Sequence, residues 1–219
     1  MSFNVAIDGP AGAGKSTIAK AVAAKKGYVY VDTGAMYRAM ALYFIRAGFA
    51  ASDEEKICNS VDDISVVLKY EDGAQHGILN GEDITGLIRT EEVGNMASAT
   101  SVYGPVRTKL VALQQELAKT TDIIMDGRDI GTVVLPNADV KVYLTASVEC
   151  RANRRYKELT EKGLDANLEQ IAKDIEERDY RDMHRDISPL KQADDAVLVD
   201  SSDMTIDEVV DTIVSLCNK

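Results

Sequence analysis

One short loop decides the fold that this sequence predicts. It reads Gly9-Pro10-Ala11-Gly12-Ala13-Gly14-Lys15-Ser16, with Thr17 next, and it fits the pattern G-x-x-x-x-G-K-[ST] at every position. The apolar run over 3–7 predicts a buried strand before it, and the helical spacing of apolar residues over 15–26 predicts a helix after it. A strand, a glycine-rich loop and a helix in this order are typical of a phosphate-binding loop.

The chemistry of phosphate binding explains this pattern. Glycines let successive backbone N–H groups point at a phosphate, and the helix that follows adds a partial positive charge at its N-terminus. We expect Lys15 to span the β- and γ-phosphates of a nucleoside triphosphate, Ser16 to ligate Mg²⁺, and Thr17 to hold the α-phosphate. The alternative is a glycine-rich turn that matches the pattern by coincidence.

The next segments extend the same architecture. A strand over 28–31 and an apolar helix over 35–47 continue a βαβ order, which predicts a parallel sheet. Beyond them we expect helices over 105–120, 148–162, 167–185 and 205–217, and strands over 122–126, 140–145 and 196–199. The predicted fold class is therefore α/β: a three-layer P-loop fold around a central, mostly parallel sheet.

Residues 60–98 depart from this order. Short β-rich runs over 64–71, 76–80 and 82–85 are separated by Asp72-Gly73 and Asn80-Gly81, which are hairpin turn sequences. We interpret the segment as a small antiparallel insertion. The alternative is that its strands extend the main sheet.

Composition limits the classes of partner. The 219 residues carry a net charge of −11, with 45% hydrophobic and 28% charged residues, which is typical of a globular domain. An acidic chain is poorly suited to nucleic-acid polymers or membrane surfaces, although a small anionic ligand needs only a local basic pocket. Cys58, Cys150 and Cys217 have no metal or redox spacing, and there is no signal-peptide or membrane-span pattern, so we expect a cytoplasmic protein.

The arginines indicate where a second anion would bind. The absence of an Asn-Lys-x-Asp motif disfavours a GTPase, and a motor ATPase usually needs a longer chain. Arg151, Arg154 and Arg155 are spaced i, i+3, i+4 on one helix face. Arg178, Asp182 and Arg185 are spaced i, i+4, i+7 on another, and guanidinium groups suit phosphoryl transfer. The alternative is that both helices are solvated and laced with salt bridges.

Two further clusters follow predicted strands. Asp126-Gly127-Arg128-Asp129 ends one strand, and Asp32-Thr33-Gly34 with Tyr37-Arg38 follows another. The carboxyl ends of parallel strands line the ligand crevice of such sheets, so we expect both clusters to serve a site.

Six motifs together resemble the bacterial cytidylate kinase family over the whole chain. They are IDGPAGAGKST (7–17), VDTGAMYR (31–38), IRTEEV (88–93), DGRDIGTVVLP (126–136), ERDYRD (177–182) and SPLKQADDA (188–196). The resemblance implies a monomeric enzyme that transfers the γ-phosphoryl group of ATP to CMP or dCMP with Mg²⁺. It also implies one kinase domain over 1–219: a core of about 1–59, 99–150 and 186–219, a monophosphate-binding insertion of about 60–98, and lid and ribose-phosphate helices of about 151–185.

The resemblance also implies roles for individual residues. Lys15, Arg128, Arg154, Arg155 and Arg185 would be catalytic, and residues 9–17 with Arg151 would bind ATP. Cytosine would be contacted by Ser98, Arg107 and Asp129, the CMP phosphate by Arg38 and Arg128, and the ribose by Arg178 and Asp182; Thr33 would keep a hydroxyl contact to the acceptor. Two rival functions stay open: a kinase for UMP or AMP, and a nucleotide-binding regulatory module without transfer activity.

Overall fold

The computed structural model describes residues 2–71 and 74–218, and the chain divides into two compact units. The first, called here the terminal unit, comprises Met1–Tyr30 and Thr120–Lys219. The second, the central unit, comprises Val31–Lys119. Each unit has a hydrophobic core of its own.

The terminal unit is built on a sheet whose strand order is β2-β6-β1-β7-β8. The pairs β1–β6, β1–β7 and β7–β8 are parallel. The strands are β1 (Asn4–Asp8), β2 (Val29–Asp32, which runs into the central unit), β6 (Ile123–Gly127), β7 (Val140–Thr145) and β8 (Val197–Asp200). The register places Asp8 level with Gly127 on one side and Tyr143 on the other. The carboxyl ends of β1, β6 and β7 therefore meet at one edge of the sheet.

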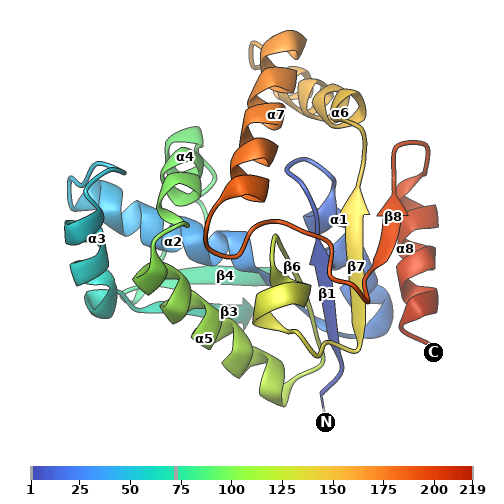
Figure 1. The fold of residues 1–219 in the computed structure, drawn as a ribbon, viewed down its shortest axis with the longest axis horizontal. Coiled ribbons are helices and arrows are strands. Elements are labelled where there is room, and N and C mark those ends of the chain that lie inside the picture. The colour runs from blue at the N-terminus through green and yellow to red at the C-terminus, as the bar shows by residue number, and fades with distance from the viewer. Residues whose placement is uncertain (1, 72–73, 219) are drawn as a thin grey trace. The chain divides into compact units, whose positions relative to one another are not determined.

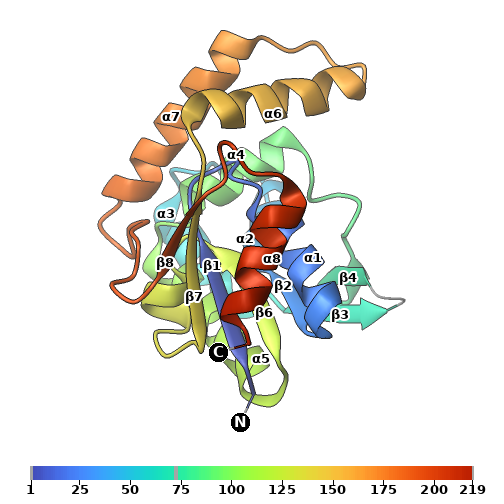
Figure 2. The same cartoon turned by 90° about the vertical axis from the view of Figure 1, so that its right-hand side faces the viewer.

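Helices complete this unit: α1 (Lys15–Lys26), α6 (Val148–Glu161), α7 (Leu168–His184), α8 (Ile206–Leu216) and the short π-helix η2 (Ile130–Val134). The apolar sides of α1 and α8 pack together over the sheet, around Ile18, Val22, Val209 and Ile213. Figure 2 shows α1 and α8 on this face. Figure 1 shows α6 and α7 beyond the carboxyl ends of β1 and β7, where the loop after β1 also lies.

The central unit combines helices with a separate antiparallel sheet of order β3-β4-β5. Its elements are α2 (Thr33–Arg46), α3 (Glu54–Ser60), η1 (Val61–Asp63), β3 (Val66–Glu71), β4 (Ala74–Leu79), β5 (Glu82–Asp83), α4 (Glu91–Thr100) and α5 (Gly104–Thr120). The helix α2 packs against α4 and the small sheet, and Met36, Met40 and Phe44 form the centre of the core.

The predicted fold class is confirmed, and the alternative that the strands of 60–98 extend the main sheet is wrong, because they form a sheet of their own. Asn80 and Gly81 both have positive φ, as the predicted hairpin turn requires. The other predicted turn, Asp72-Gly73, lies outside the described residues. The boundaries predicted for core, insertion and lid remain predictions.

Four elements were not predicted: α3, η1, η2 and α4. Most of α4 occupies residues that we assigned to the antiparallel insertion. The helix α4 begins after Thr90, whose side chain accepts a hydrogen bond from the Val93 N–H, and two glutamates occupy its first turn. This N-terminal cap and the favourable position of the two glutamates stabilise the helix. The segment has only ten residues, and its hydrophobic periodicity was too weak to predict a helix.

Across residues 2–71 and 74–218, every helix is too short or too polar to cross a bilayer.

Candidate functional site

The phosphate loop joins β1 to α1 in the terminal unit, as the sequence predicted. Its first residue must be glycine, because Gly9 has a φ of +152° and a Cβ there would lie 1.9 Å from the carbonyl oxygen of Leu144. The loop backbone thus approaches the end of β7 more closely than any side chain allows.

Lys15 is buried at the start of α1, and its Nζ donates a hydrogen bond to the carbonyl oxygen of Pro10 at 2.7 Å. Burial lowers its pKa well below the ordinary lysine value, and the nearby charges of Arg128 and Arg178 lower it further. The carboxylates of Asp126 and Asp8 act in the opposite direction. The ammonium group therefore sits among other cations, a setting in which a bound anion would be favoured.

Ser16 faces Asp126, which the sequence analysis placed in a site cluster after its strand without assigning it a role. Its Oγ donates to Oδ2 of Asp126 at 2.9 Å, and the Tyr30 hydroxyl donates to Oδ1 at 2.8 Å. Asp126 lies one residue before the end of β6, level with Ile7 of β1, so it lies near the carboxyl end of the strand that leads into the phosphate loop. No group of three or more His, Cys, Asp or Glu side chains forms a metal cluster within the residues described. Oxygen donors in small number suit Mg²⁺, which usually shares its coordination with phosphates and water.

Asp8 is a second buried carboxylate that sequence reasoning passed over. It ends β1, and its two oxygens accept hydrogen bonds from the N–H groups of Ile130 and Gly131 at 2.8 and 2.7 Å. Burial raises the pKa of Asp8 from 3.8 to about 6, although these two hydrogen bonds act against the rise. The carboxylate fixes the start of η2, directly after Asp129.

The helix α7 brings its charged face to the loop after β6. Arg128 Nε donates to Asp182 Oδ2 at 2.7 Å, and Arg185 Nη2 lies 3.5 Å from Asp129 Oδ1. Burial opposes both charges of the first pair, yet Asp182 raises the pKa of Arg128, and Arg128 holds the pKa of Asp182 below its ordinary value. The i, i+4, i+7 face predicted from sequence thus meets Arg128 and Asp129 within one unit.

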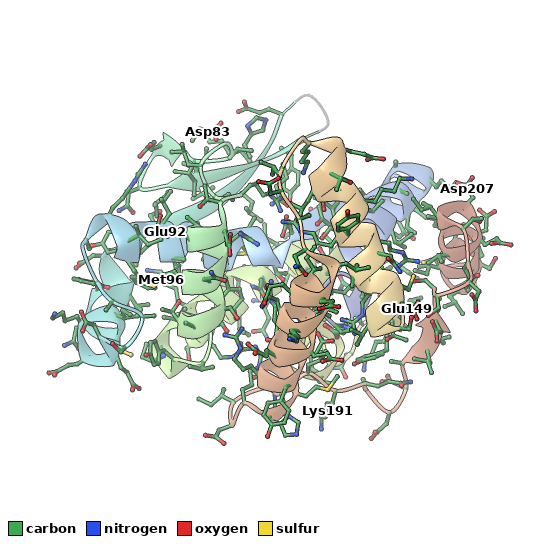
Figure 3. All side chains as sticks on the ribbon, turned by 90° about the horizontal axis from the view of Figure 1, so that it is seen from above. Asp83, Glu92, Met96, Glu149, Lys191 and Asp207 are labelled. Carbon is green, nitrogen blue, oxygen red and sulfur yellow. The ribbon has the colours of Figure 1, made fainter. Side chains whose placement is uncertain are left out.

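The three arginines predicted to share a face of α6 contact different groups. Arg154 Nη2 donates to the carbonyl oxygen of Ser201 at 2.6 Å, and the exposed Arg155 pairs with Glu158 at 2.8 Å. Arg151 is buried and pairs with Asp179 of α7, which the sequence assignments missed. Figure 3 shows α6, which carries Glu149, lying beside α7.

In the central unit, α2, α4 and α5 carry the remaining predicted residues. Thr33 is buried in the first turn of α2. Arg38 Nη1 donates to the carbonyl oxygens of Ile88 and Thr90 at 3.1 and 3.4 Å, just before α4. An added Cβ on Gly94 would lie 2.9 Å from Arg38 Nη1, so a larger residue there would displace the end of the Arg38 side chain.

The base-reading residues predicted in this unit are Ser98 and Arg107. Arg107 is buried in α5, with its guanidinium carbon 5.8 Å from the Tyr37 ring centre and Nη1 bonded to the Ser101 carbonyl oxygen at 3.2 Å. The Ser101 hydroxyl in turn donates to the carbonyl oxygen of Ser98 at 2.8 Å. A hydrogen-bonded chain therefore links the two residues through Ser101.

Asp32 and Arg89 form an ion pair that the sequence assignments did not anticipate. Asp32 caps α2 through the Ala35 N–H, and its Oδ2 accepts from Arg89 Nη2 at 2.7 Å. The Arg89 side chain is 59% exposed and follows Ile88, whose carbonyl oxygen binds Arg38. Arg89 and the guanidinium group of Arg38 therefore both lie at the segment that leads into α4.

Known proteins resemble this chain over almost its whole length. The cytidylate kinase family matches residues 5–219. A cytidylate kinase of Lactobacillus johnsonii is 51% identical over 217 residues, covering 99% of this chain and 94% of the relative. One of Caldicellulosiruptor saccharolyticus is 48% identical over 217 residues, covering 99% and 96%.

Solved structures resemble the fold at low sequence identity. An uncharacterized protein from Eubacterium ventriosum gives a TM-score of 0.55 at 10% identity, covering all of this chain and 99% of the other. Shikimate kinase from Bacteroides thetaiotaomicron gives 0.51 at 12% identity, covering 99% of each chain.

Proposed function

This chain belongs to the cytidylate kinase family, and on that premise we propose how its residues transfer the γ-phosphoryl group of ATP to CMP or dCMP. The observation that carries the proposal is the buried Lys15 of a complete phosphate loop, with the charges of Arg128 and Arg178 acting on it. Cations gathered where a phosphoryl group would move stabilise the charge that spreads over its oxygens in the transition state.

The donor, ATP, is held by Gly9 to Thr17. Backbone N–H groups of the loop and the N-terminus of α1 contact its phosphates, and Lys15 reaches the β- and γ-phosphates. Arg154 and Arg155 exchange their present partners for the triphosphate when the lid closes. The ion pair between Arg155 and Glu158 is exposed to solvent, so breaking it costs little free energy.

Mg²⁺ fits the oxygens at Ser16 and Asp126. The serine hydroxyl would ligate the ion directly, and the Asp126 carboxylate orients that hydroxyl through their 2.9 Å hydrogen bond. When bound with ATP, the ion neutralises charge on the β- and γ-phosphates. Asp126 is buried between Ser16 and Tyr30, so its position is fixed before any ligand arrives.

The acceptor nucleotide is recognised by its three parts. We assign the phosphate to Arg38, Arg128 and Arg185, with the Thr33 hydroxyl as a further donor. The ribose is assigned to Arg178 and Asp182, and the base to Ser98, Arg107 and Asp129. Cytosine presents an amine donor beside two acceptors, so it suits one carboxylate with donor-rich side chains, whereas uracil presents the reverse pattern.

The transfer is a direct in-line displacement. The attacking atom is a phosphate oxygen of CMP that is already ionised at neutral pH, so the site needs no strong general base. Positioning and charge neutralisation by Lys15, Arg128, Arg154, Arg155 and Arg185 supply the catalysis. Closure of residues 151–185 and 60–98 over the nucleotides excludes water, which would otherwise receive the phosphoryl group.

We further propose a monomeric, cytoplasmic enzyme that acts on small nucleotides and binds neither nucleic-acid polymers nor membranes. The net charge of −11 supports the exclusion of polyanionic partners.

The base assignment is tested by Asp129→Ala, with the exposed Asp203→Ala as a control for the charge change. We expect Asp129→Ala to lose most of its preference for CMP over UMP while ATP still binds, and Asp203→Ala to keep the wild-type ratio. An unchanged ratio of CMP to UMP use in Asp129→Ala would show that Asp129 does not read the base.

A further inference from the structure

The base of α6 is joined to α7 by a buried ion pair close to the phosphate loop. Arg151 Nη1 and Asp179 Oδ2 are 2.6 Å apart, and both side chains are almost fully buried in the terminal unit. Burying an ion pair costs free energy unless its remaining donors and acceptors are also hydrogen-bonded, and a pair that is fully hydrogen-bonded is held rigidly. The other partners of these two groups therefore indicate what the pair does.

Both side chains hold Ala11, the third residue of the loop. Asp179 Oδ1 accepts a hydrogen bond from the Ala11 N–H at 3.1 Å, and Arg151 Nη1 donates to the Ala11 carbonyl oxygen at 2.7 Å. Arg151 Nε also donates to the carbonyl oxygen of Ala146, just before α6, at 2.9 Å. The N–H and the carbonyl of one loop residue are thus both held by the pair.

The next loop residue packs on the same structure. Gly12 has a φ of +74°, and a Cβ there would lie 3.5 Å from Arg151 Cβ and 4.0 Å from Ile175 Cδ1. Ile175 precedes Asp179 by one helical turn, so the backbone at Gly12 rests against the stem of Arg151 and the side of α7. Two consecutive loop residues are therefore fixed by α6 and α7.

We propose that Arg151 and Asp179 are positioning residues that brace the phosphate loop for ATP, so that Arg151 acts on the triphosphate through the loop. The inference rests on the proposed function, in which ATP is the donor. Phosphate binding by such a loop depends on several backbone N–H groups that point toward one position. Because Ala11 and Gly12 are held in place, this orientation exists before ATP binds.

The direction in which one substitution changes the affinity for ATP distinguishes this proposal from a purely electrostatic effect. Asp179 is a negative charge near a loop that binds a tetravalent anion, so removing its charge alone would strengthen ATP binding. The brace predicts the opposite, because Asp179→Asn loses the ion pair that orients Arg151 and Ala11. If Arg151 were a phosphate ligand and nothing more, Asp179→Asn would leave ATP affinity close to wild type.

The experiment measures MgATP binding by calorimetry without CMP, and then KM for ATP and for CMP by initial rates. The variants are Asp179→Asn, Arg151→Lys, Arg151→Met and the double Arg151→Met/Asp179→Asn, with Asp174→Asn as the control. Asp174 is an exposed aspartate on the same helix, so its substitution makes the same change in charge and residue type.

We expect Asp179→Asn to weaken ATP binding by about tenfold with the KM for CMP changed less than about twofold. Arg151→Lys should bind ATP better than Arg151→Met, since it keeps the charge. The double variant should bind ATP no more weakly than the worse single variant, because the two residues act as a unit. Asp179→Asn with unchanged or tighter ATP binding would overturn the proposal, as would additive effects in the double variant.

A lone buried charge destabilises a fold, so a further variant removes both charges at once: Arg151→Met with Asp179→Leu. It should fold and still bind ATP about tenfold more weakly than wild type; wild-type affinity would overturn the brace. Wild-type enzyme that binds ATP but makes no ADP when CMP is added would overturn the proposed function, while the ATP titrations would still decide the role of this pair.

Discussion

The substitution Asp8→Asn would remove a buried charge from the end of β1 and keep the shape of the side chain. The Asp8 carboxylate is 5% exposed and accepts hydrogen bonds from the Ile130 and Gly131 N–H groups, which fixes the backbone after Asp129. The amide of the variant would accept one of these bonds and turn its own N–H toward the other donor. The expected change is in both stability and acceptor binding.

The sign follows from the raised pKa of Asp8. Its pKa is about 6 in the folded protein against an ordinary value of 3.8, so the folded state takes up a proton before the unfolded state does as pH falls. Ionised Asp8 therefore destabilises the fold by about 3 kcal/mol above pH 6, and this penalty fades as pH falls toward 4. As pH falls from 7.5 to 5, the free energy of unfolding of the wild type should rise by about 1 to 2 kcal/mol relative to that of Asp8→Asn.

Urea denaturation of both proteins at pH 7.5, 6 and 5 measures this difference, and Asp203→Asn controls for the loss of a surface carboxylate. Differencing against the variant removes the effects of the other titrating groups. If the difference in free energy of unfolding between wild type and Asp8→Asn were the same at all three pH values, the raised pKa of Asp8 would be refuted. We also expect the KM for CMP to rise more than the KM for ATP, since Asp8 holds the loop that carries Asp129.

Three other substitutions test the donor side. Lys15→Ala should abolish triphosphate binding while the fold is kept, and unchanged ATP affinity by calorimetry would contradict the role of the loop. Gly9→Ala should lower the free energy of unfolding by about 3 kcal/mol or more, because its Cβ would lie 1.9 Å from the Leu144 carbonyl oxygen; a wild-type urea midpoint would show that the loop can move away. Asp126→Asn should raise the Mg²⁺ concentration for half-maximal rate about tenfold, through the lost orientation of Ser16, and an unchanged Mg²⁺ dependence would remove Asp126 from the metal site.

Local patterns made most of the fold predictable. The helix after the phosphate loop spans the predicted residues 15–26, because Gly14 and Gly27 delimit it and both adopt the left-handed conformation. The hairpin at Asn80-Gly81 was equally legible, since few residues other than asparagine and glycine accept two positive φ values. In contrast, α4 depends on one threonine cap and on packing against α2, which no local periodicity reveals.

The site was predictable in its residue types and less so in its pairings. Helical spacing placed Asp182 and Arg185 on one face, and both contact the loop after β6. The same reasoning grouped Arg151 with Arg154 and Arg155, whose partners are instead set by long-range contacts to Asp179, Ser201 and Glu158. Asp8 and Asp179 escaped notice because a lone carboxylate in a sequence does not reveal which backbone N–H groups will meet it in space.

The acceptor profile of the wild-type enzyme tests the central claim most directly. ADP production with MgATP is measured by initial rates with CMP, dCMP, UMP or AMP as the added acceptor, and with none. We predict turnover that depends on the acceptor and a preference for CMP and dCMP over UMP and AMP. A clear preference for AMP, or ATP binding without acceptor-dependent turnover, would contradict the account.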